Sequence, residues 1–199
     1  MPDEYLVFER AAEERHEWLD GLTYAMAGES LEHSTICVNV SATLNVQLRG
    51  RDCRVLSPNM KVCAMLPTDP RQKGLFAYPD ATVVCGKPVF HNEHRDVLIN
   101  PRVIIEVLSN TTERYDRGEK FVRYRQNSAL TDYALVSQSR PSIELFSCGA
   151  DARWLYTFEL SLAGHLAIPS IGCELRLADV YDRIEFPGAD QLQSPLAAE

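Results

Sequence analysis

A single carboxylate interrupts an apolar run that is typical of a buried β-strand. This residue is Glu106, in VIIEV at 103–107. An ionised carboxylate inside a strand is costly unless it is paired, protonated or bound to a metal. Asp80 stands at the head of another apolar run, YPDATVV, after a proline that fixes the local backbone. If these two strands are neighbours, the two carboxylates come together.

A predicted helix follows the second strand and carries the complementary charge. Asp116, Lys120 and Tyr124 recur every four residues and therefore share one face of that helix. The helix could return Lys120 over the two carboxylates. Two carboxylates, with waters and a phosphate oxygen, suit a hard divalent cation such as Mg²⁺, which would also neutralise the buried charges.

A purely structural interpretation uses the same residues. Asp80 could be a turn residue at a strand start. Glu106 could form an ion pair with a nearby cation, namely Arg102, Arg123 or Lys120. The order of Asp80, Glu106 and Lys120 on strand, strand and helix favours the functional interpretation, because three independent coincidences would otherwise be needed.

The elements that must position these residues follow from hydrophobic periodicity and from glycine and proline stops. They predict α+β architecture, with a mixed central sheet flanked by helices. In chain order we expect a helix over 3–20, a strand within 22–28, a helix over 30–49, strands within 53–66, 77–88 and 101–109, a helix over 112–126, strands within 131–137, 141–147 and 152–160, and a closing helical segment over 173–186.

Composition is that of an ordinary globular protein. The chain has 199 residues, of which 45% are hydrophobic and 24% charged, enough for one sizeable core. We expect one domain over 1–186 and a disordered tail over 187–199, where small and polar residues dominate. No run reaches the roughly 20 apolar residues of a membrane span, and no signal peptide is recognisable, so we expect a cytoplasmic protein.

Charge and cysteine usage narrow the possible functions. The formal charge of −8 disfavours tight non-specific binding to a polyanion. Six cysteines occur singly, with no CxxC pair and no histidine at zinc-ligand spacing, so we expect reduced thiols in the core and no structural zinc site. No GxxxxGK[ST] loop is present, which disfavours a hydrolase acting on a small phosphorylated molecule.

Several stretches together resemble the Uma-type restriction endonuclease family, a branch of the PD-(D/E)xK nuclease superfamily. The resemblance spans residues 4–184 and is densest in EVLSNTTERYDRGEKFVRY. The other stretches are ERHEWLDG, YAMAG, EHS, YPDATVVCG, DYALVSQ and PSIGCELRLADVY.

The resemblance implies a restriction-endonuclease-like core with a divalent-metal site. It places Asp80 and Glu106 as metal ligands, Lys120 as the catalytic lysine, and Glu17 as a further acidic residue reaching in from the first helix. The superfamily usually has a lysine two residues after the strand glutamate, where this chain has Leu108. The lysine would therefore have migrated to the helix.

The resulting hypothesis is hydrolysis of phosphodiester bonds in nucleic acid, most simply DNA. Mg²⁺, for which Mn²⁺ could substitute, would be held by Asp80, Glu106 and the main-chain carbonyl of Val107. We expect a homodimer, because cutting both strands of a duplex suits two-fold symmetry. The alternative is a catalytically silent module that keeps the nuclease fold to bind nucleic acid or protein.

Three further residues are accessory candidates. His33 could contact a phosphate or the active site, or be an ordinary polar residue at a helix start. Asp116 could orient Lys120, or form an ordinary ion pair with it. Tyr124 could line the cleft, although an aromatic residue at helical spacing is more often part of the core.

Overall fold

The computed structural model describes residues 2–65 and 74–186. The predicted tail at 187–199 lies outside this range. The helices and strands, in chain order, are α1 (Pro2–Ala11), β1 (His16–Leu19), β2 (Leu22–Ala25), α2 (Leu31–Gln47), β3 (Cys53–Leu56), β4 (Lys61–Met65), β5 (Leu75–Ala77), β6 (Ala81–Cys85), β7 (Val97–Leu98), β8 (Val103–Leu108), α3 (Glu113–Tyr115), the π-helical turn η1 (Asp116–Lys120), α4 (Phe121–Tyr124), β9 (Asp132–Ser137), β10 (Ile143–Cys148), β11 (Trp154–Glu159), β12 (His165–Ile168), the 3₁₀ turn η2 (Pro169–Ile171), β13 (Cys173–Arg176) and α5 (Leu177–Val180).

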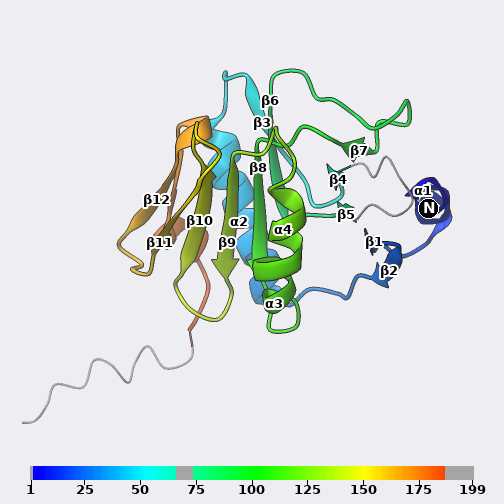
Figure 1. The fold of residues 1–199 in the computed structure, drawn as a ribbon. Coiled ribbons are helices and arrows are strands. Elements are labelled where there is room, and N and C mark those ends of the chain that lie inside the picture. Colours follow the sequence, from blue (N-terminus) through cyan, green and yellow to red (C-terminus); the bar gives the residue numbers. More distant parts are fainter. Residues whose placement is uncertain (1, 66–73, 187–199) are drawn as a thin grey trace, which may run out of the picture.

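The larger sheet has six strands in the order β11-β10-β9-β8-β6-β3 (Figure 1). It is mixed, because β8 and β9 run parallel while the other neighbouring pairs are antiparallel. β8 lies near its centre, and all six residues of the strand are buried. The continuous apolar run around Glu106 is therefore that of a strand covered on both faces, as predicted.

The two faces of β8 pack against different helices, because successive side chains of a strand alternate. Val103, Ile105 and Val107 belong to the core formed with α2, α5 and the β12–β13 hairpin. Ile104 and Leu108 belong to a second core, which contains Tyr124 of α4. Glu106 shares their parity and therefore faces the α3–α4 helical segment.

A second sheet stands beside the first, in the order β2-β1-β5-β4-β7 (Figure 1). Helix α1 packs on it through Tyr5 and Leu6, in a third core with Trp18 and Phe76. Its β1 and β2 strands, the start of α2 and the segment after β8 together line one cleft. In the part of the chain that the structure describes, no helix is long and apolar enough to cross a membrane.

The first helix is shorter than predicted. It ends at Ala11, and His16–Leu19 forms strand β1 instead of a second half of the helix. Strand β1 is followed by the Asp20–Gly21 pair, where both residues have positive φ, 50° and 97°. Two such residues form the tight turn that joins β1 to β2 as a hairpin, so Gly21 turns a hairpin and does not stop a helix.

The closing segment also differs from the prediction. Cys173–Arg176 is a strand, paired with the unpredicted strand β12, and only Leu177–Val180 is helical. Alternating burial along Cys173–Arg176 gives the period of two that a half-buried strand shows. The predicted helices over 30–49 and 112–126 are confirmed, the second with a π-helical turn in its middle.

The prediction that all cysteines are reduced is wrong for one pair. Cys53 and Cys85 are directly opposite each other on β3 and β6 and form a disulfide. The two cysteines are 32 residues apart in the sequence, so their contact could not be predicted from local patterns. Cys37, Cys63 and Cys173 are buried, as expected, and Cys148 is partly buried.

Candidate active site

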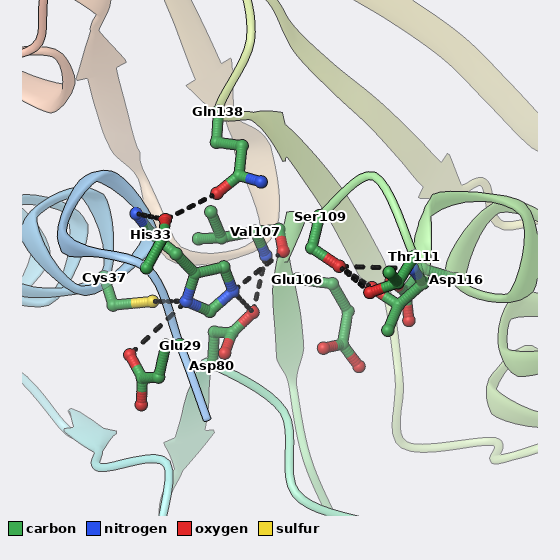
Figure 2. A network of polar contacts seen from close by, with 12 residues as sticks. Glu29, His33, Cys37, Asp80, Glu106, Val107, Ser109, Thr111, Asp116 and Gln138 are labelled. Atoms are coloured by element: carbon green, nitrogen blue, oxygen red, sulfur yellow. Dashed lines mark hydrogen bonds and ion pairs between the residues drawn. The ribbon is translucent and has the colours of Figure 1, made fainter. Parts of the chain in front are cut away.

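The sheet brings Asp80 and Glu106 side by side. The antiparallel register of β6 and β8 pairs Ala81 with Ile105, so the residue before β6 lies opposite Glu106. Asp80 Oδ2 accepts a hydrogen bond from the Val107 amide at 2.6 Å. Figure 2 shows the two carboxylates on either side of the Val107 backbone. The prediction that these two strands are neighbours is therefore confirmed.

Lys120 reaches the same place from the helical segment. Its Nζ lies 3.1 Å from Glu106 Oε1, 3.1 Å from Glu17 Oε1 and 3.3 Å from Asp116 Oδ1. Lys120, Glu106 and Asp116 are almost fully buried, and Glu17 is buried. Glu17 also accepts a hydrogen bond from the Tyr78 amide at 3.3 Å. It comes from strand β1 and not from the first helix, which corrects the prediction of its origin while keeping it in the cluster.

The cluster holds more negative than positive charge. Glu106 Oε1 and Asp116 Oδ1 are buried and lack a hydrogen-bond donor in good geometry, although both lie within ion-pair distance of Lys120. One ammonium therefore serves three carboxylates, and Asp80 adds a fourth beside them. An ion pair with Lys120 alone leaves the other buried charges uncompensated.

Burial and these charges shift the protonation equilibria. Burial raises the pKa of Glu106 well above its usual value, and the neighbouring Asp116, Asp80 and Glu17 add to this rise while Lys120 opposes it. Burial alone would lower the pKa of Lys120, but the attraction of Glu106, Glu17 and Asp116 outweighs it and holds that pKa well above its usual value. Lys120 is therefore held as an ammonium.

The cluster opens into a cleft of about 890 Å³. Glu17, Asp80, Glu106, Asp116 and Lys120 all line it. The remaining lining comes mainly from β1–β2, the start of α2 and the loop after β8, including Tyr24, Glu29, Ser30, Ser109, Asn110 and Tyr115. The ring of Tyr115 lies 5.6 Å from Lys120 Nζ, a cation–π contact that the sequence gave no reason to expect.

The π-helical turn Asp116–Lys120 shapes the helical side of the site. In the middle of this helical segment, the Asp116 carbonyl accepts a hydrogen bond from the Tyr133 hydroxyl at 2.9 Å. Single π-helical turns inside helices are often found at functional sites. The turn lies where the helix presents Asp116 and Lys120 to Glu106.

His33 contacts the metal-ligand candidates from the start of α2. Its Nε2 lies 3.0 Å from the Val107 carbonyl oxygen and 3.4 Å from Asp80 Oδ2 (Figure 2). Burial alone would lower the pKa of His33, but the hydrogen bond and charge of Asp80, followed by those of Glu29, raise it to about 9. His33 is thus part of the cleft, as one of the two sequence interpretations expected.

Tyr124 does not line the cleft. It is fully buried in the core against Tyr133, with ring centroids 5.7 Å apart. Tyr124 is therefore a core residue, and the prediction that it is an accessory residue of the site is wrong. Leu108, where a strand lysine would usually stand, is buried in the same core. Asp116 is buried, so its contact with Lys120 differs from an ordinary exposed i, i+4 pair.

A second ion pair anchors the segment that carries Lys120. Arg117 Nη1 and Nη2 donate to the two Glu144 oxygens of β10 at 2.7 and 2.8 Å, and Tyr156 adds a hydrogen bond at 3.0 Å. Burial alone would raise the pKa of Glu144, but the bonds from Arg117 and Tyr156 hold it below its usual value. The paired geometry fixes the orientation of the π-helical turn relative to the sheet.

We predict that Glu144→Gln lowers the free energy of unfolding by about 1–3 kcal/mol at neutral pH. Because the folded-state pKa of Glu144 is lowered, its stabilisation is present above the unfolded-state pKa and disappears as pH falls through the folded-state value. Urea unfolding at neutral and acidic pH should therefore show a wild-type advantage that shrinks with acidification. Glu113→Gln, which alters the more exposed partner of Arg117, should cost at most about 0.5 kcal/mol. A pH-independent difference for Glu144→Gln would contradict the prediction.

The donors present fit a hard divalent cation. Asp80, Glu106 and the Val107 carbonyl offer only oxygen atoms, which Mg²⁺ and Mn²⁺ prefer. The excess of buried carboxylates, with orphaned oxygens on Glu106 and Asp116, gives a cation an electrostatic reason to bind. Val107 O already contacts His33, but a carbonyl oxygen has two lone pairs and can accept a second partner.

Comparison with known proteins gives the same fold and a family. The chain is similar to a solved structure titled "Crystal structure of a putative nuclease belonging to DUF820" from Anabaena variabilis ATCC 29413. The two share 16% identity with a TM-score of 0.70, covering 90% of this chain and 96% of the other. At this identity the likeness shows the fold alone, and it confirms the predicted α+β architecture with mixed sheets.

Two sequence relatives come from Synechocystis sp., both named as uncharacterized proteins. The protein slr1290 is 33% identical over 185 residues, which is 93% of each chain. The protein sll1609 is 29% identical over 154 residues, which is 77% of this chain and 84% of the relative. A family model described as "Uma2: Putative restriction endonuclease" matches residues 2–177. With a match over most of its length, this chain belongs to the Uma2 family.

Proposed function

We propose that this protein is a divalent-metal-dependent endonuclease that hydrolyses phosphodiester bonds, most simply in DNA. One observation carries the proposal: Asp80, just before β6, and Glu106, on the neighbouring strand β8, line one cleft of about 890 Å³, and the Lys120 ammonium lies 3.1 Å from Glu106. Family membership supports the same reaction class.

Asp80, Glu106 and the Val107 carbonyl would hold the cation. When bound, Mg²⁺ would supply Lewis-acid activation of the scissile phosphate and of an attacking water. Glu17 Oε1 lies 3.1 Å from Lys120 Nζ and gives the site a further carboxylate, which would allow a second cation.

Lys120 would act as a charged hydrogen-bond donor. Three surrounding carboxylates favour its ammonium form, so it is suited to orient the attacking water and to stabilise negative charge that develops on the phosphate oxygens. Asp116 would position it, because its carboxylate lies 3.3 Å from Nζ and does not belong to the proposed metal ligands. His33 would hold the Val107 carbonyl and Asp80 in place through Nε2.

The test is cleavage of supercoiled plasmid with Mg²⁺ or Mn²⁺ and with a chelator. We expect metal-dependent nicking or linearisation by the wild type, and a loss of at least about 100-fold in Asp80→Asn, because a metal ligand is removed. Glu93→Gln, on the exposed loop before β7, matches the change in charge and should keep full activity. Calorimetric titration with Mn²⁺ should show weakened binding only in Asp80→Asn.

Equal metal binding by Asp80→Asn and wild type would contradict the site. If metal binds through Asp80 but no DNA or RNA is cut, the alternative of a catalytically silent module is favoured. The formal charge of −8, which is unfavourable for a nuclease, is the observation that supports this alternative.

We also propose a homodimer, since two active sites related by two-fold symmetry suit a duplex substrate.

A further inference from the structure

A second group of potential ligands lies beside the candidate active site. Glu29 lies just before α2, and His33 and Cys37 are one helical turn apart on the same face of that helix. His33 Nδ1 lies 3.6 Å from Cys37 Sγ and 3.4 Å from Glu29 Oε2 (Figure 2). All three ligand atoms lie within 4.8 Å of one another.

The two separations from His33 Nδ1 match edges of a tetrahedral zinc site. With Zn–S of about 2.3 Å and Zn–N or Zn–O of about 2.0 Å, tetrahedral geometry puts sulfur and nitrogen about 3.5 Å apart, and nitrogen and oxygen about 3.3 Å apart. The nitrogen–sulfur and nitrogen–oxygen distances agree with both values without rearrangement. The Glu29 side chain is partly exposed, so small rotations can adjust its carboxylate.

The other nitrogen of His33 has the contacts of a metal-bound histidine. A ligating histidine usually donates its second N–H to a carbonyl or carboxylate, which fixes the ring and its tautomer. Here Nε2 faces the Val107 carbonyl at 3.0 Å and the Asp80 carboxylate at 3.4 Å. Because the pKa of His33 is raised to about 9, zinc would have to displace the Nδ1 proton at neutral pH. With Nε2 as donor, Nδ1 of the deprotonated ring would then bind the cation between Cys37 and Glu29.

A nucleophilic Cys–His–Glu arrangement explains the cluster less well. Glu29 cannot be the third member of such a triad, because it contacts the same ring nitrogen as Cys37, Nδ1 of His33. Asp80 does lie at the other nitrogen, Nε2, but the buried Cys37 thiol does not line the cleft from which a substrate would approach. Burial, followed by the negative charges of Asp80 and Glu29, raises the pKa of Cys37 and disfavours a metal-free thiolate. A bound cation would reverse that preference, because zinc binds the thiolate and releases its proton.

We propose that Glu29, His33 and Cys37 bind one zinc ion, with the fourth position open to water from the cleft that Glu29 and His33 line. A thiolate and an imidazole suit Zn²⁺ and not Mg²⁺, so this site is chemically separate from the oxygen-only site at Asp80 and Glu106. Zinc would lock the His33 ring against Val107 and Asp80. The sequence predicted no structural zinc site, because it has no CxxC pair and no histidine at the usual zinc-ligand spacing, and the proposed His-x₃-Cys site departs from that prediction.

The test uses Zn²⁺ alone, in competition with a chromophoric chelator, on the full chain. We expect one zinc ion per chain, and binding weakened at least about tenfold in Cys37→Ser and in Glu29→Gln. Cys148→Ser, at a thiol on β10, and Glu32→Gln, at an exposed carboxylate on the same helix, are the matched controls and should bind like wild type. Circular dichroism checks that each variant is folded.

Cobalt substitution reports on the sulfur ligand directly. Wild type with Co²⁺ should show a near-ultraviolet thiolate-to-metal absorption band, which Glu32→Gln should keep and Cys37→Ser should lose. Because this band does not depend on cleavage, the zinc site and the nuclease activity can fail independently. If the wild type shows no band, or if Glu29→Gln and Glu32→Gln bind zinc equally, the zinc proposal is overturned.

Discussion

Replacing Lys120 by methionine will abolish cleavage and destabilise the metal-free protein. The substitution removes the ammonium that contacts Glu17, Glu106 and Asp116 at 3.1–3.3 Å and leaves three buried carboxylates together. Leaving buried charge without its partner costs about 3–5 kcal/mol. Losing a charged donor at the reacting phosphate lowers the rate by at least about 100-fold. Urea unfolding in chelator and plasmid cleavage measure the two effects separately.

Lys61→Met is the matched control for this experiment. Lys61 is also a buried lysine, but it lies on β4 with its ammonium 5.0 and 5.2 Å from the ring centroids of Tyr5 and Tyr78. The carboxylates that act on it, Glu9 and Asp96, keep other donors: Glu9 accepts from the His16 amide and the Tyr78 hydroxyl, and Asp96 from Arg10. We therefore expect a smaller loss of stability and full cleavage. A Lys120→Met protein as stable as wild type would show that the cluster is already largely protonated or open to solvent.

Glu106→Gln should have the opposite effect on stability and the same effect on activity. Neutralising one of several carboxylates around a single ammonium relieves buried repulsion, which we expect to raise the free energy of unfolding in chelator by about 1–3 kcal/mol. The same change removes a proposed metal ligand, so cleavage should fall at least about 100-fold. Urea unfolding and plasmid cleavage of one preparation give both values.

The comparison with Glu144→Gln makes this result specific. Both are buried glutamates, but Glu144 has two bonds from Arg117 and one from Tyr156, whereas Glu106 Oε1 has no donor in good geometry. The two Glu→Gln changes should therefore shift stability in opposite directions at neutral pH. If Glu106→Gln is less stable than wild type, Glu106 is held as a favourable structural ion pair, and the argument from excess charge fails.

The neighbourhood of Asp80, Glu106 and Lys120 could be predicted because each lies on an element with a clear local pattern. The apolar run 103–108 is short and rich in β-branched residues, which favours a covered strand, and the four-residue spacing of Asp116 and Lys120 is kept on the helical segment. Their meeting then needs only one antiparallel pairing, of β6 with β8.

Elements that depend on distant partners were not predictable in the same way. Residues 12–19 favour a helix locally, but His16–Leu19 pairs with β2 and β5, and Trp18 packs against Phe76 with ring centroids 5.7 Å apart. Tertiary pairing overrides helix propensity there. The Cys53–Cys85 disulfide and the contact of His33 with Val107, 74 residues away, likewise depend on register and packing that no single segment contains.

The geometry of the site depends on the number of residues in the π-helical turn Asp116–Lys120 as well as on their types. A side chain added at Gly118 would meet nothing within 4 Å, so there is room for a substitution in this turn. Removing a residue is different, because each position advances an α-helix by about 100°. A one-residue deletion would put the two flanking segments out of phase, so that the Arg117–Glu144 anchor and the burial of Tyr124 could not both be kept. In this segment a shortened sequence would lose Lys120 from the cluster while retaining every side chain that the chemistry requires.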